Sequence, residues 1–469
     1  MSIAEPRIAP PVPLGRLTRL WDKEALLIAA LMVGVPNVLF LILSPWFLLR
    51  RMISPAIYLI VSMIAVFLPW PAGFLVFAVA AAADAFFVVA YLFDMPLETT
   101  LMSIRYSDDI NIQASTIYIG AGAYFIVLAA LLTWLTRRYR RELRRASPLL
   151  ALLLAVGIGF ADFSFNGYKP ISKPPFESAM MQNGLTAESI VARDRNLLIV
   201  IVEGLGAFAD PAERGVLSDR LLAASASGFE IRSGTSNYYG STTGAEIREL
   251  CGTWGTYVSF LRGDIGDCLP AKLARAGYPT TSYHASDGDL FSRRTWYPAA
   301  GIGKMNFLED IERERPHAVV SRCGTVFLGM CDGDVGELVH QDLLNAGNRR
   351  GLYYWLTLNS HIPYEPMSDN RFGCRTSAPS IPSLVPCQLA EIWSEVFDKV
   401  AEIASDPSTP PVDILIAGDH NTPLWSREAH GHFLPDKVDW YYLEDRRHLR
   451  ETSGGEPGPS IRSQPVSFR

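Results

Sequence analysis

IAGDHNTP, residues 416–423, places Asp419 and His420 side by side directly after an apolar run. Residues 413–417 have the pattern of a buried β-strand that ends at Gly418. In an α/β sheet, ligands bind outside the carboxyl ends of the strands, and an adjacent carboxylate and imidazole suit one divalent metal ion. A Gly-Asp-His sequence alone is also compatible with a polar turn, so the interpretation depends on what other polar residues follow strands.

Two further segments supply such residues. The strand predicted for residues 197–202 ends at Glu203, and a Gly-Ser-Thr-Thr-Gly turn follows at residues 240–244. A carboxylate, a hydroxyl, an Asp and a His, each from a strand end or a loop, are the components of a metal-activated threonine nucleophile. The alternatives are that Glu203 caps a following helix and that the threonine of the turn is a helix N-cap.

The first part of the chain is apolar. Hydrophobic residues make up 49% of the 469 residues and are concentrated before about residue 165. A membrane-spanning helix needs roughly 20 apolar residues, and five runs approach that length: residues 26–49, 53–70, 71–93, 112–136 and 148–165. The first run is too long, and is followed by too many others, for a cleaved signal peptide. Asp84, in the third run, fits either a proton relay or a hydrogen bond inside a helix bundle.

Basic residues set the predicted orientation, because they are retained in the cytoplasm. The densest basic run is RRYRRELRR, residues 137–145, which we assign to the cytoplasmic side. Counting along the runs then places the N-terminus inside, the acidic loop of residues 94–111 outside, and everything after residue 165 outside the cytoplasm. Arg50 and Arg51 fall on the outer side and count against this orientation.

All six cysteines lie beyond the last apolar run. An even number confined to one domain indicates disulfides and an oxidising compartment. Proximity in sequence suggests Cys251–Cys268, Cys323–Cys331 and Cys374–Cys387, although six cysteines can pair in many other ways. A zinc–thiolate cluster would use Cys-x-x-Cys spacing, which the sequence lacks.

From residue 196 onward, predicted strands and helices alternate, which indicates βαβ units and a mainly parallel sheet. The predicted strands cover residues 197–202, 280–283, 352–358, 413–417 and 440–443, and the predicted helices cover residues 269–276 and 390–404. The net charge of −6 and the absence of a basic patch outside the cytoplasmic loop argue against a nucleic-acid partner. We therefore expect a cytoplasmic tail (1–23), a transmembrane domain of about five helices (24–165), a connector (166–195), an extracytoplasmic catalytic domain (196–450) and a disordered tail (451–469).

The order of these motifs resembles the alkaline phosphatase superfamily. Within it, the chain looks most like the membrane-anchored, sulfatase-like transferases: lipoteichoic acid synthase and the phosphoglycerol transferases of osmoregulated periplasmic glucans. The resemblance implies an alkaline-phosphatase-like α/β domain with a divalent metal (Mn, Zn or Mg) held by Glu203, Thr242, Asp419 and His420. The turn YGSTTGAEIRELCG, residues 239–252, resembles the family pattern of G-x-T followed by Cys-Gly, which selects Thr242 over Thr243 as the catalytic nucleophile.

The resemblance implicates three further segments. LTLNSHIPY, residues 356–364, resembles a segment that places His361 over the phosphate as a catalytic residue. YHASDGDLFSRR, residues 283–294, resembles a head-group-binding stretch and implicates His284, Phe291 and Arg293, although His284 and Arg293 also fit simple pairing with surface carboxylates. His430-Gly431 resembles a further metal ligand of the phosphoethanolamine transferases, which leaves the expected number of metal ions at one or two.

The predicted function is the transfer of a phosphoglycerol head group from a membrane phospholipid to an extracytoplasmic glycan through a phosphorylated threonine. The alternatives are a phosphoethanolamine transferase acting on a lipid or a glycan, a sulfatase-like phosphodiester hydrolase, and a membrane protein with a non-enzymatic domain. The turn lacks the Cys-Gly-Thr-Ser-Thr form usual in phosphoethanolamine transferases, and CLPAK, residues 268–272, lacks the Arg of a formylglycine sulfatase motif. The expected location is a bacterial inner membrane, crossed several times, with the catalytic domain in the periplasm or outside.

Overall fold

The computed structural model describes residues 23–93, 95–109, 111–145, 147–167, 173–447 and 461–463. The chain divides into two compact units, one of Met1–Val89 and Ile119–Lys169 and the other of Ala90–Tyr118 and Pro170–Arg469. The predicted cytoplasmic tail up to residue 22, and the predicted disordered tail except for residues 461–463, lie outside the described residues. The segment Ala90–Tyr118, which we expected within the transmembrane domain, belongs to the second unit.

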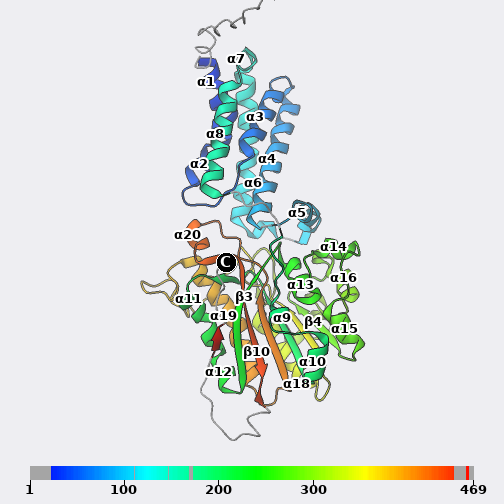
Figure 1. The fold of residues 1–469 in the computed structure, drawn as a ribbon. Helices are drawn as coiled ribbons and strands as arrows, with labels where there is room; N and C mark the ends of the chain where they lie inside the picture. The colour runs from blue at the N-terminus through cyan, green and yellow to red at the C-terminus, as the bar shows by residue number, and fades with distance from the viewer. Residues whose placement is uncertain are drawn as a thin grey trace, which may run out of the picture. The chain divides into compact units, whose positions relative to one another are not determined.

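The first unit is a bundle of apolar helices (Figure 1). Four described helices are long and apolar enough to cross a membrane: Lys23–Leu43 (α1, η3 and α2), Trp70–Leu92 (α4), Thr116–Arg138 (α6) and Leu149–Asn166 (α8). A fifth, α3 (Ser54–Ala65), has 12 residues and is shorter than the predicted second run. Pro69 and Pro71 flank the start of α4, because proline cannot donate a backbone hydrogen bond inside a helix. The structure agrees with about five membrane helices.

A charged pair is buried inside this bundle. Asp84 of α4 accepts hydrogen bonds from Arg51 (Nε to Oδ1, 3.1 Å), from Ser54 (2.5 Å) and from the hydroxyl of Tyr58 (3.2 Å). The backbone N–H of Arg51 donates to Asp162 of α8 at 2.9 Å. Arg51 and Asp84 are at most 5% exposed, so each charge offsets the other in an apolar surrounding. Asp84 thus hydrogen-bonds within the bundle, and Arg51, which counted against the predicted orientation, is neutralised.

The second unit is built on a mixed sheet with the strand order β11-β3-β10-β9-β1-β8-β4-β5, and β2 pairs with β10. Neighbouring strands from β9 to β5 run parallel, whereas β10 is antiparallel to β9 and β3. The mainly parallel sheet predicted from the sequence is confirmed. Its strands are β1 (Asn196–Val202), β2 (Gly206–Phe208), β3 (Phe229–Asn237), β4 (Thr280–His284), β5 (Lys304–Asn306), β8 (Leu352–Leu356), β9 (Val412–Gly418), β10 (Phe433–Asp445) and β11 (Ile461–Ser463), and a separate pair is β6 (Arg322–Cys323) with β7 (Gly329–Met330).

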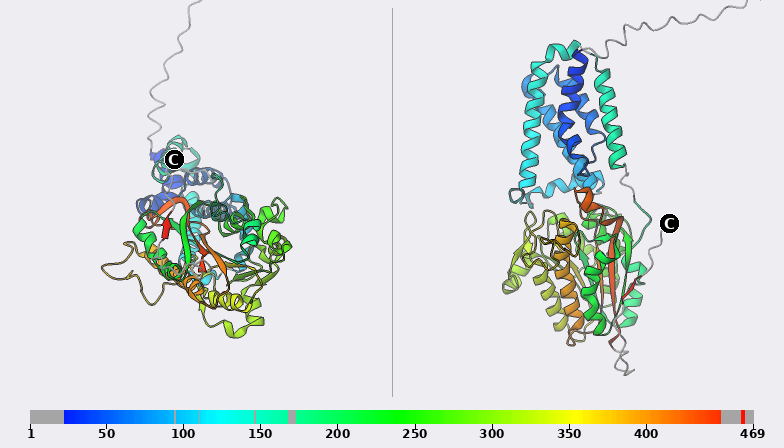
Figure 2. Two further views of the ribbon diagram at one scale, coloured as in Figure 1. Left: turned by 60° about the horizontal axis from the view of Figure 1, so that its bottom comes forward. Right: turned by 90° about the vertical axis from the view of Figure 1, so that its left-hand side faces the viewer.

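Helices cover both faces of this sheet (Figure 2). The sequence of β1, NLLIVIV, is buried throughout, as a strand covered on both faces requires. Alternate residues of a strand point to opposite faces, and those of β1 join two cores: Leu198, Val200 and Val202 in one, and Leu197, Ile199 and Ile201 in the other.

The first core contains residues from one set of helices: α11 (Pro211–Ser218), α12 (Leu222–Ala226), α17 (Leu308–Glu314), α18 (Asp332–Asn345), α19 (Leu384–Ser405) and α20 (Arg427–His430). The second core contains residues from another set: α9 (Ala179–Gln182), α10 (Ala187–Arg193), α13 (Thr242–Cys251), α14 (Tyr257–Leu261), α15 (Leu269–Arg275) and α16 (Arg293–Ala300). A further helix of the unit is α5 (Leu97–Ser103).

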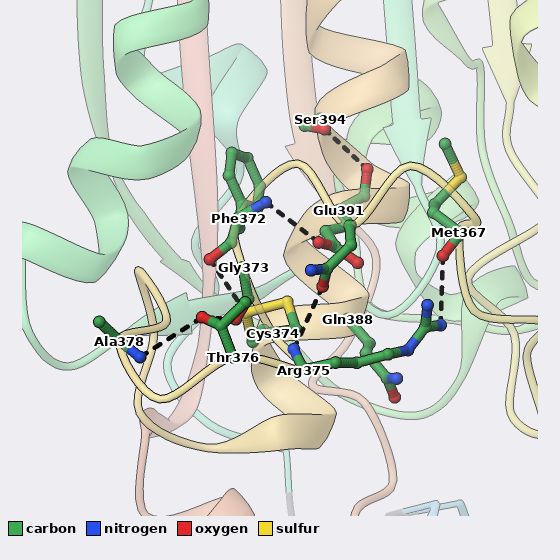
Figure 3. The surroundings of a disulfide bond; sticks show 12 residues. Met367, Phe372, Gly373, Cys374, Arg375, Thr376, Ala378, Gln388, Glu391 and Ser394 are labelled. Atoms are coloured by element: carbon green, nitrogen blue, oxygen red, sulfur yellow. Dashed lines mark hydrogen bonds between the residues drawn. A yellow bond between two sulfur atoms is a disulfide. The ribbon is translucent and has the colours of Figure 1, made fainter.

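All six cysteines form disulfides, and the three pairs are those suggested by proximity in the sequence: Cys251–Cys268, Cys323–Cys331 and Cys374–Cys387. The third joins the loop before α19 to the first turns of that helix (Figure 3). In the same loop, the backbone N–H of Phe372 donates to Glu391 of α19 at 3.1 Å. The disulfide and this hydrogen bond together fix an irregular loop on a long helix.

Replacing Asp84 with Leu should lower the free energy of unfolding by about 3–5 kcal/mol, because Arg51 then remains buried without its counter-charge. Thermal unfolding of the full chain in detergent measures the effect. The double replacement of Arg51 by Met and Asp84 by Leu should recover most of the loss, since no buried charge then remains. Equal destabilisation of the single and double variants would contradict charge compensation.

Reporter fusions after residue 165 should read as extracytoplasmic, and fusions within residues 137–145 as cytoplasmic, because the basic run is retained inside. Protein isolated without reductant should show no thiol that reacts with a maleimide before reduction and six after it, since all six cysteines are paired. Inverted reporters, or six reactive thiols before reduction, would refute the assigned compartment.

Candidate active site

Three neighbouring parallel strands, β9, β1 and β8, end at the same edge of the sheet. Glu203 directly follows β1, Asp419 and His420 directly follow β9, and the loop after β8 leads to His361. Because the register pairs Val202 with Gly418, the residues that follow these two strands leave the sheet at the same level. The topology therefore brings together polar residues that are far apart in the sequence.

Glu203, Asp419 and His420 each offer one ligand atom, and these atoms lie within 4.8 Å of one another. His420 Nε2 is 3.5 Å from Glu203 Oε1 and 3.3 Å from Asp419 Oδ2. His420 Nδ1 lies 2.8 Å from the carbonyl oxygen of Asn421, where an Nδ1–H would donate, which leaves the lone pair of Nε2 directed at the carboxylates. All three side chains are buried.

This cluster fits a divalent cation. Two buried carboxylates beside an imidazole lone pair need a positive charge, and within the described residues neither Glu203 nor Asp419 forms an ion pair with a lysine or arginine. Among the described residues, no donor forms a hydrogen bond to Asp419 Oδ2. Burial, together with the neighbouring Glu203 carboxylate, raises the pKa of Asp419 to about 7. Two carboxylate oxygens and one imidazole nitrogen are ligands that Zn, Mn or Mg sites use.

Thr242 is the first residue of α13, and its hydroxyl donates to Glu203 Oε2 at 3.0 Å. The N-cap of this helix is Ser241, so the alternative role of Thr242 as the N-cap does not apply. Thr242 is partly exposed, whereas Thr243 is fully buried and its hydroxyl has no hydrogen-bond partner within the described structure. Of the two threonines, Thr242 is the one that reaches the candidate metal ligands.

Two residues that the sequence analysis missed, Arg248 and Glu249, support the loop after β9. Arg248 is fully buried and donates to the carbonyl oxygens of Gly418 (2.7 Å) and Asp419 (3.2 Å). It also pairs with Glu249 at 2.6 Å, and Glu249 accepts a hydrogen bond from Ser178 at 2.7 Å. The sequence did contain a signal for them: they lie on the helix that begins at the threonine turn, and the start of that helix must lie at the site.

His361 lies in the loop after β8 and packs against two aromatic rings. Its ring centroid is 6.4 Å from that of Phe93, with the planes stacked, and 4.1 Å from that of Phe327. Nδ1 lies 2.9 Å from the carbonyl oxygen of Ile362. Burial, and next the nearby His420, lower the pKa of His361 to about 4. The imidazole is therefore neutral at pH 7.

Asp332, also missed from the sequence, holds this loop in place. It lies at the start of α18, and its buried carboxylate accepts hydrogen bonds from the backbone N–H groups of Leu358 (3.0 Å) and Asn359 (2.8 Å). The next residue, Ser360, donates to the carbonyl oxygen of Glu203 at 2.6 Å. These bonds connect the loop that carries His361 to the end of β1.

Arg293 lies near both Phe291 and His284. His284 ends β4, and its Nδ1 is 3.1 Å from the carbonyl oxygen of Leu356. Burial, and next the charge of Arg293, lower the pKa of His284 to about 3. Arg293 is buried, forms an ion pair with Glu246 at 3.1 Å, and lies 5.4 Å from the ring centroid of Phe291. Its partner is thus a buried carboxylate rather than a surface one, and the head-group role of the three residues stays a prediction.

His430 lies at the end of α20. The described group that could hold a metal at this edge consists of Glu203, Asp419 and His420, and His430 is not a member. The nearby His432 pairs with Glu213 at 2.8 Å. The assignment of His430 as a metal ligand therefore stays a prediction.

No family model matches this sequence, and no curated protein matches it. Among solved structures, the lipoteichoic acid synthase LtaP from Listeria monocytogenes is similar with a TM-score of 0.41 and 15% identity, over 57% of this chain and 67% of that one. A protein of the alkaline phosphatase superfamily from Vibrio parahaemolyticus has a TM-score of 0.39 and 14% identity, over 57% of this chain and 62% of its own. The phosphoglycerol transferase GacH from Streptococcus pyogenes, in complex with sn-glycerol-1-phosphate, has a TM-score of 0.38 and 16% identity, over 56% of this chain and 72% of its own. Each of these similarities covers somewhat more than half of this chain.

Proposed function

We propose that this chain is a metal-dependent phosphotransferase that moves a phosphoglycerol head group from a membrane phospholipid to an extracytoplasmic glycan. The observation that supports this proposal best is the hydrogen bond from Thr242 to Glu203, inside the cluster with Asp419 and His420. A candidate nucleophile and a candidate cation site share one carboxylate there. The proposed location is a bacterial inner membrane, with the second unit on the extracytoplasmic side.

The reaction would proceed in two displacements. In the first, Thr242 Oγ attacks the phosphorus of the donor, the bond from phosphorus to the diacylglycerol oxygen breaks, and that oxygen takes up the proton of the Thr242 hydroxyl. In the second, a hydroxyl of the acceptor attacks the same phosphorus and Thr242 leaves with the acceptor's proton. A divalent cation held by Glu203, Asp419 and His420 would lower the pKa of the Thr242 hydroxyl and offset charge on the phosphate oxygens.

The residues of the chain have distinct tasks in this scheme. Glu203 orients the Thr242 hydroxyl by accepting its hydrogen bond. His361 is neutral, so a ring nitrogen without a hydrogen can receive the proton of an attacking alcohol. Arg248 fixes the backbone of Asp419, which keeps the carboxylate aimed at the site. A covalent intermediate permits transfer to an alcohol in place of hydrolysis when water is excluded.

Phosphoethanolamine is the second candidate head group. Asp287 and Asp289 are exposed in the loop after His284, and their charge is opposite to that of an ammonium group. The two head groups differ in mass, so the measured mass of the covalent intermediate identifies which one the chain transfers.

Replacing Asp419 with Asn should remove tight metal binding and activity while leaving thermal unfolding nearly unchanged, because one charged ligand is lost from a site with two carboxylates. Metal content, measured by elemental mass spectrometry after gel filtration, checks the binding. The control is Asp264→Asn, an exposed carboxylate outside the site, which should keep its metal. Full activity of the Asp419 variant, or of the wild type after exhaustive chelation, would rule out a metal mechanism.

Replacing Thr242 with Ala should lower turnover by several powers of ten, as the loss of a covalent nucleophile usually does. Thr243→Ala should cost far less, because the Thr243 hydroxyl makes no hydrogen bond to any residue that the structure describes. When the wild type is exposed to phosphatidylglycerol without acceptor, intact-mass spectrometry should detect a glycerophosphate ester on Thr242. A phosphoethanolamine adduct, formed from phosphatidylethanolamine in its place, would select the second head group. An adduct mapped to Thr243, or turnover surviving in Thr242→Ala, would show that the nucleophile is misassigned.

A further inference from the structure

Helix α5 and the residue after it present an apolar face to solvent. Leu97, Leu101 and Ile104 are 45%, 62% and 55% exposed, and their spacing of four and then three residues puts them on one side of a helix. The three apolar side chains are thus turned outward, and the charged residues Glu98 and Arg105 are exposed beside them. On another side, Thr99 and Thr100 are each only 5% exposed, and Met102 packs against the second core.

This segment is attached to the second unit close to the candidate active site. Tyr106, just beyond α5, is buried and packs against the ring of Phe291 with the centroids 5.3 Å apart. Farther along, the backbone N–H of Asn111 donates to the carbonyl oxygen of Val326 at 3.0 Å. Before α5, Phe93 stacks on His361. The outward apolar face thus belongs to a segment whose inner side contacts residues predicted to bind the head group and the phosphate.

Chain connectivity indicates what covers the face. Helix α4 ends at Leu92 and α6 begins at Thr116, and both have the length and composition of membrane spans. A segment whose two ends enter a bilayer stays near its surface, and Leu97 follows the end of α4 by only a few residues. An exposed apolar helix face is unfavourable in water but is buried when the helix lies at the boundary between headgroups and acyl chains.

We propose that the face formed by Leu97, Leu101 and Ile104 lies in the lipid leaflet that faces the second unit, at the boundary between headgroups and acyl chains. The partner is a phospholipid bilayer. The binding of this face to the bilayer does not depend on the reaction that the site catalyses. The further consequence, that the bilayer holds the site at the depth of a lipid phosphodiester, rests on the proposed function.

The cysteine pattern makes a direct test possible. All six native cysteines are in disulfides, so Leu101→Cys introduces a single reactive thiol into the full chain. An environment-sensitive fluorophore on that thiol is measured in nanodiscs of phosphatidylglycerol and phosphatidylethanolamine, with and without lipids that carry a nitroxide near the headgroup. The matched control is Leu222→Cys on α12, which is 38% exposed and lies at the other end of the second unit from α5 (Figure 1).

The expected result is several-fold stronger quenching by the nitroxide lipids at residue 101 than at residue 222. Leu97→Cys and Ile104→Cys repeat the measurement on the same face, so one poorly folding variant does not decide the outcome. Quenching no stronger than at the control, at all three positions, overturns the proposal. Cross-linking of the Leu101→Cys thiols between two copies, with no lipid quenching, also overturns it and assigns the face to a dimer. Neither result requires metal, donor or turnover, so failure here is distinguishable from failure of the proposed function.

Discussion

Parallel pairing of β1 with β9 sets Val202 opposite Gly418, and the geometry of the whole candidate site follows from this register. A shift by one residue would turn every side chain of the strand to the other face and would separate Glu203 from Asp419. The register also requires close backbone packing beyond the strands. A Cβ at Gly418 would lie 1.9 Å from the carbonyl oxygen of Leu205, so only glycine fits there.

The buried ion pairs of this protein differ from the carboxylates of the candidate site. Arg51 with Asp84, Arg248 with Glu249, and Arg293 with Glu246 are opposite charges in direct contact, which makes them supports of the fold. Glu203 and Asp419 are buried next to each other beside the imidazole of His420, and among the described residues neither forms an ion pair with a lysine or arginine. Burying two carboxylates side by side destabilises a fold. A cation bound between them would offset this cost.

Much of this arrangement could be predicted from the sequence, and the elements that were not predicted have physical reasons. The strands β1 and β9 are continuous apolar runs, so Glu203, Asp419 and His420 could be placed at strand ends by inspection. The second unit's antiparallel strands were harder: of β10, with 13 residues, only residues 440–443 were predicted, because its first half is partly exposed and polar. Helix α13 was not among the predicted helices, because Glu246, Arg248 and Glu249 make its sequence polar, although all three are buried and paired inside the protein.

The segment that contains α5 was read as an acidic outer loop, because two turns of helix give too short a pattern to reveal an amphipathic face. Four of its five charged residues are acidic, which gave the loop its name, and its apolar residues become informative only once their exposure is known.

The pair of Arg51 and Asp84 has a consequence for the biogenesis of the protein. Either charge alone opposes the partitioning of its own segment from the translocon into lipid. Arg51 emerges from the ribosome before Asp84, so the segment that carries it cannot become stably embedded until α4 has been synthesised. Residues 51–84 are thus expected to enter the bilayer as one helical hairpin.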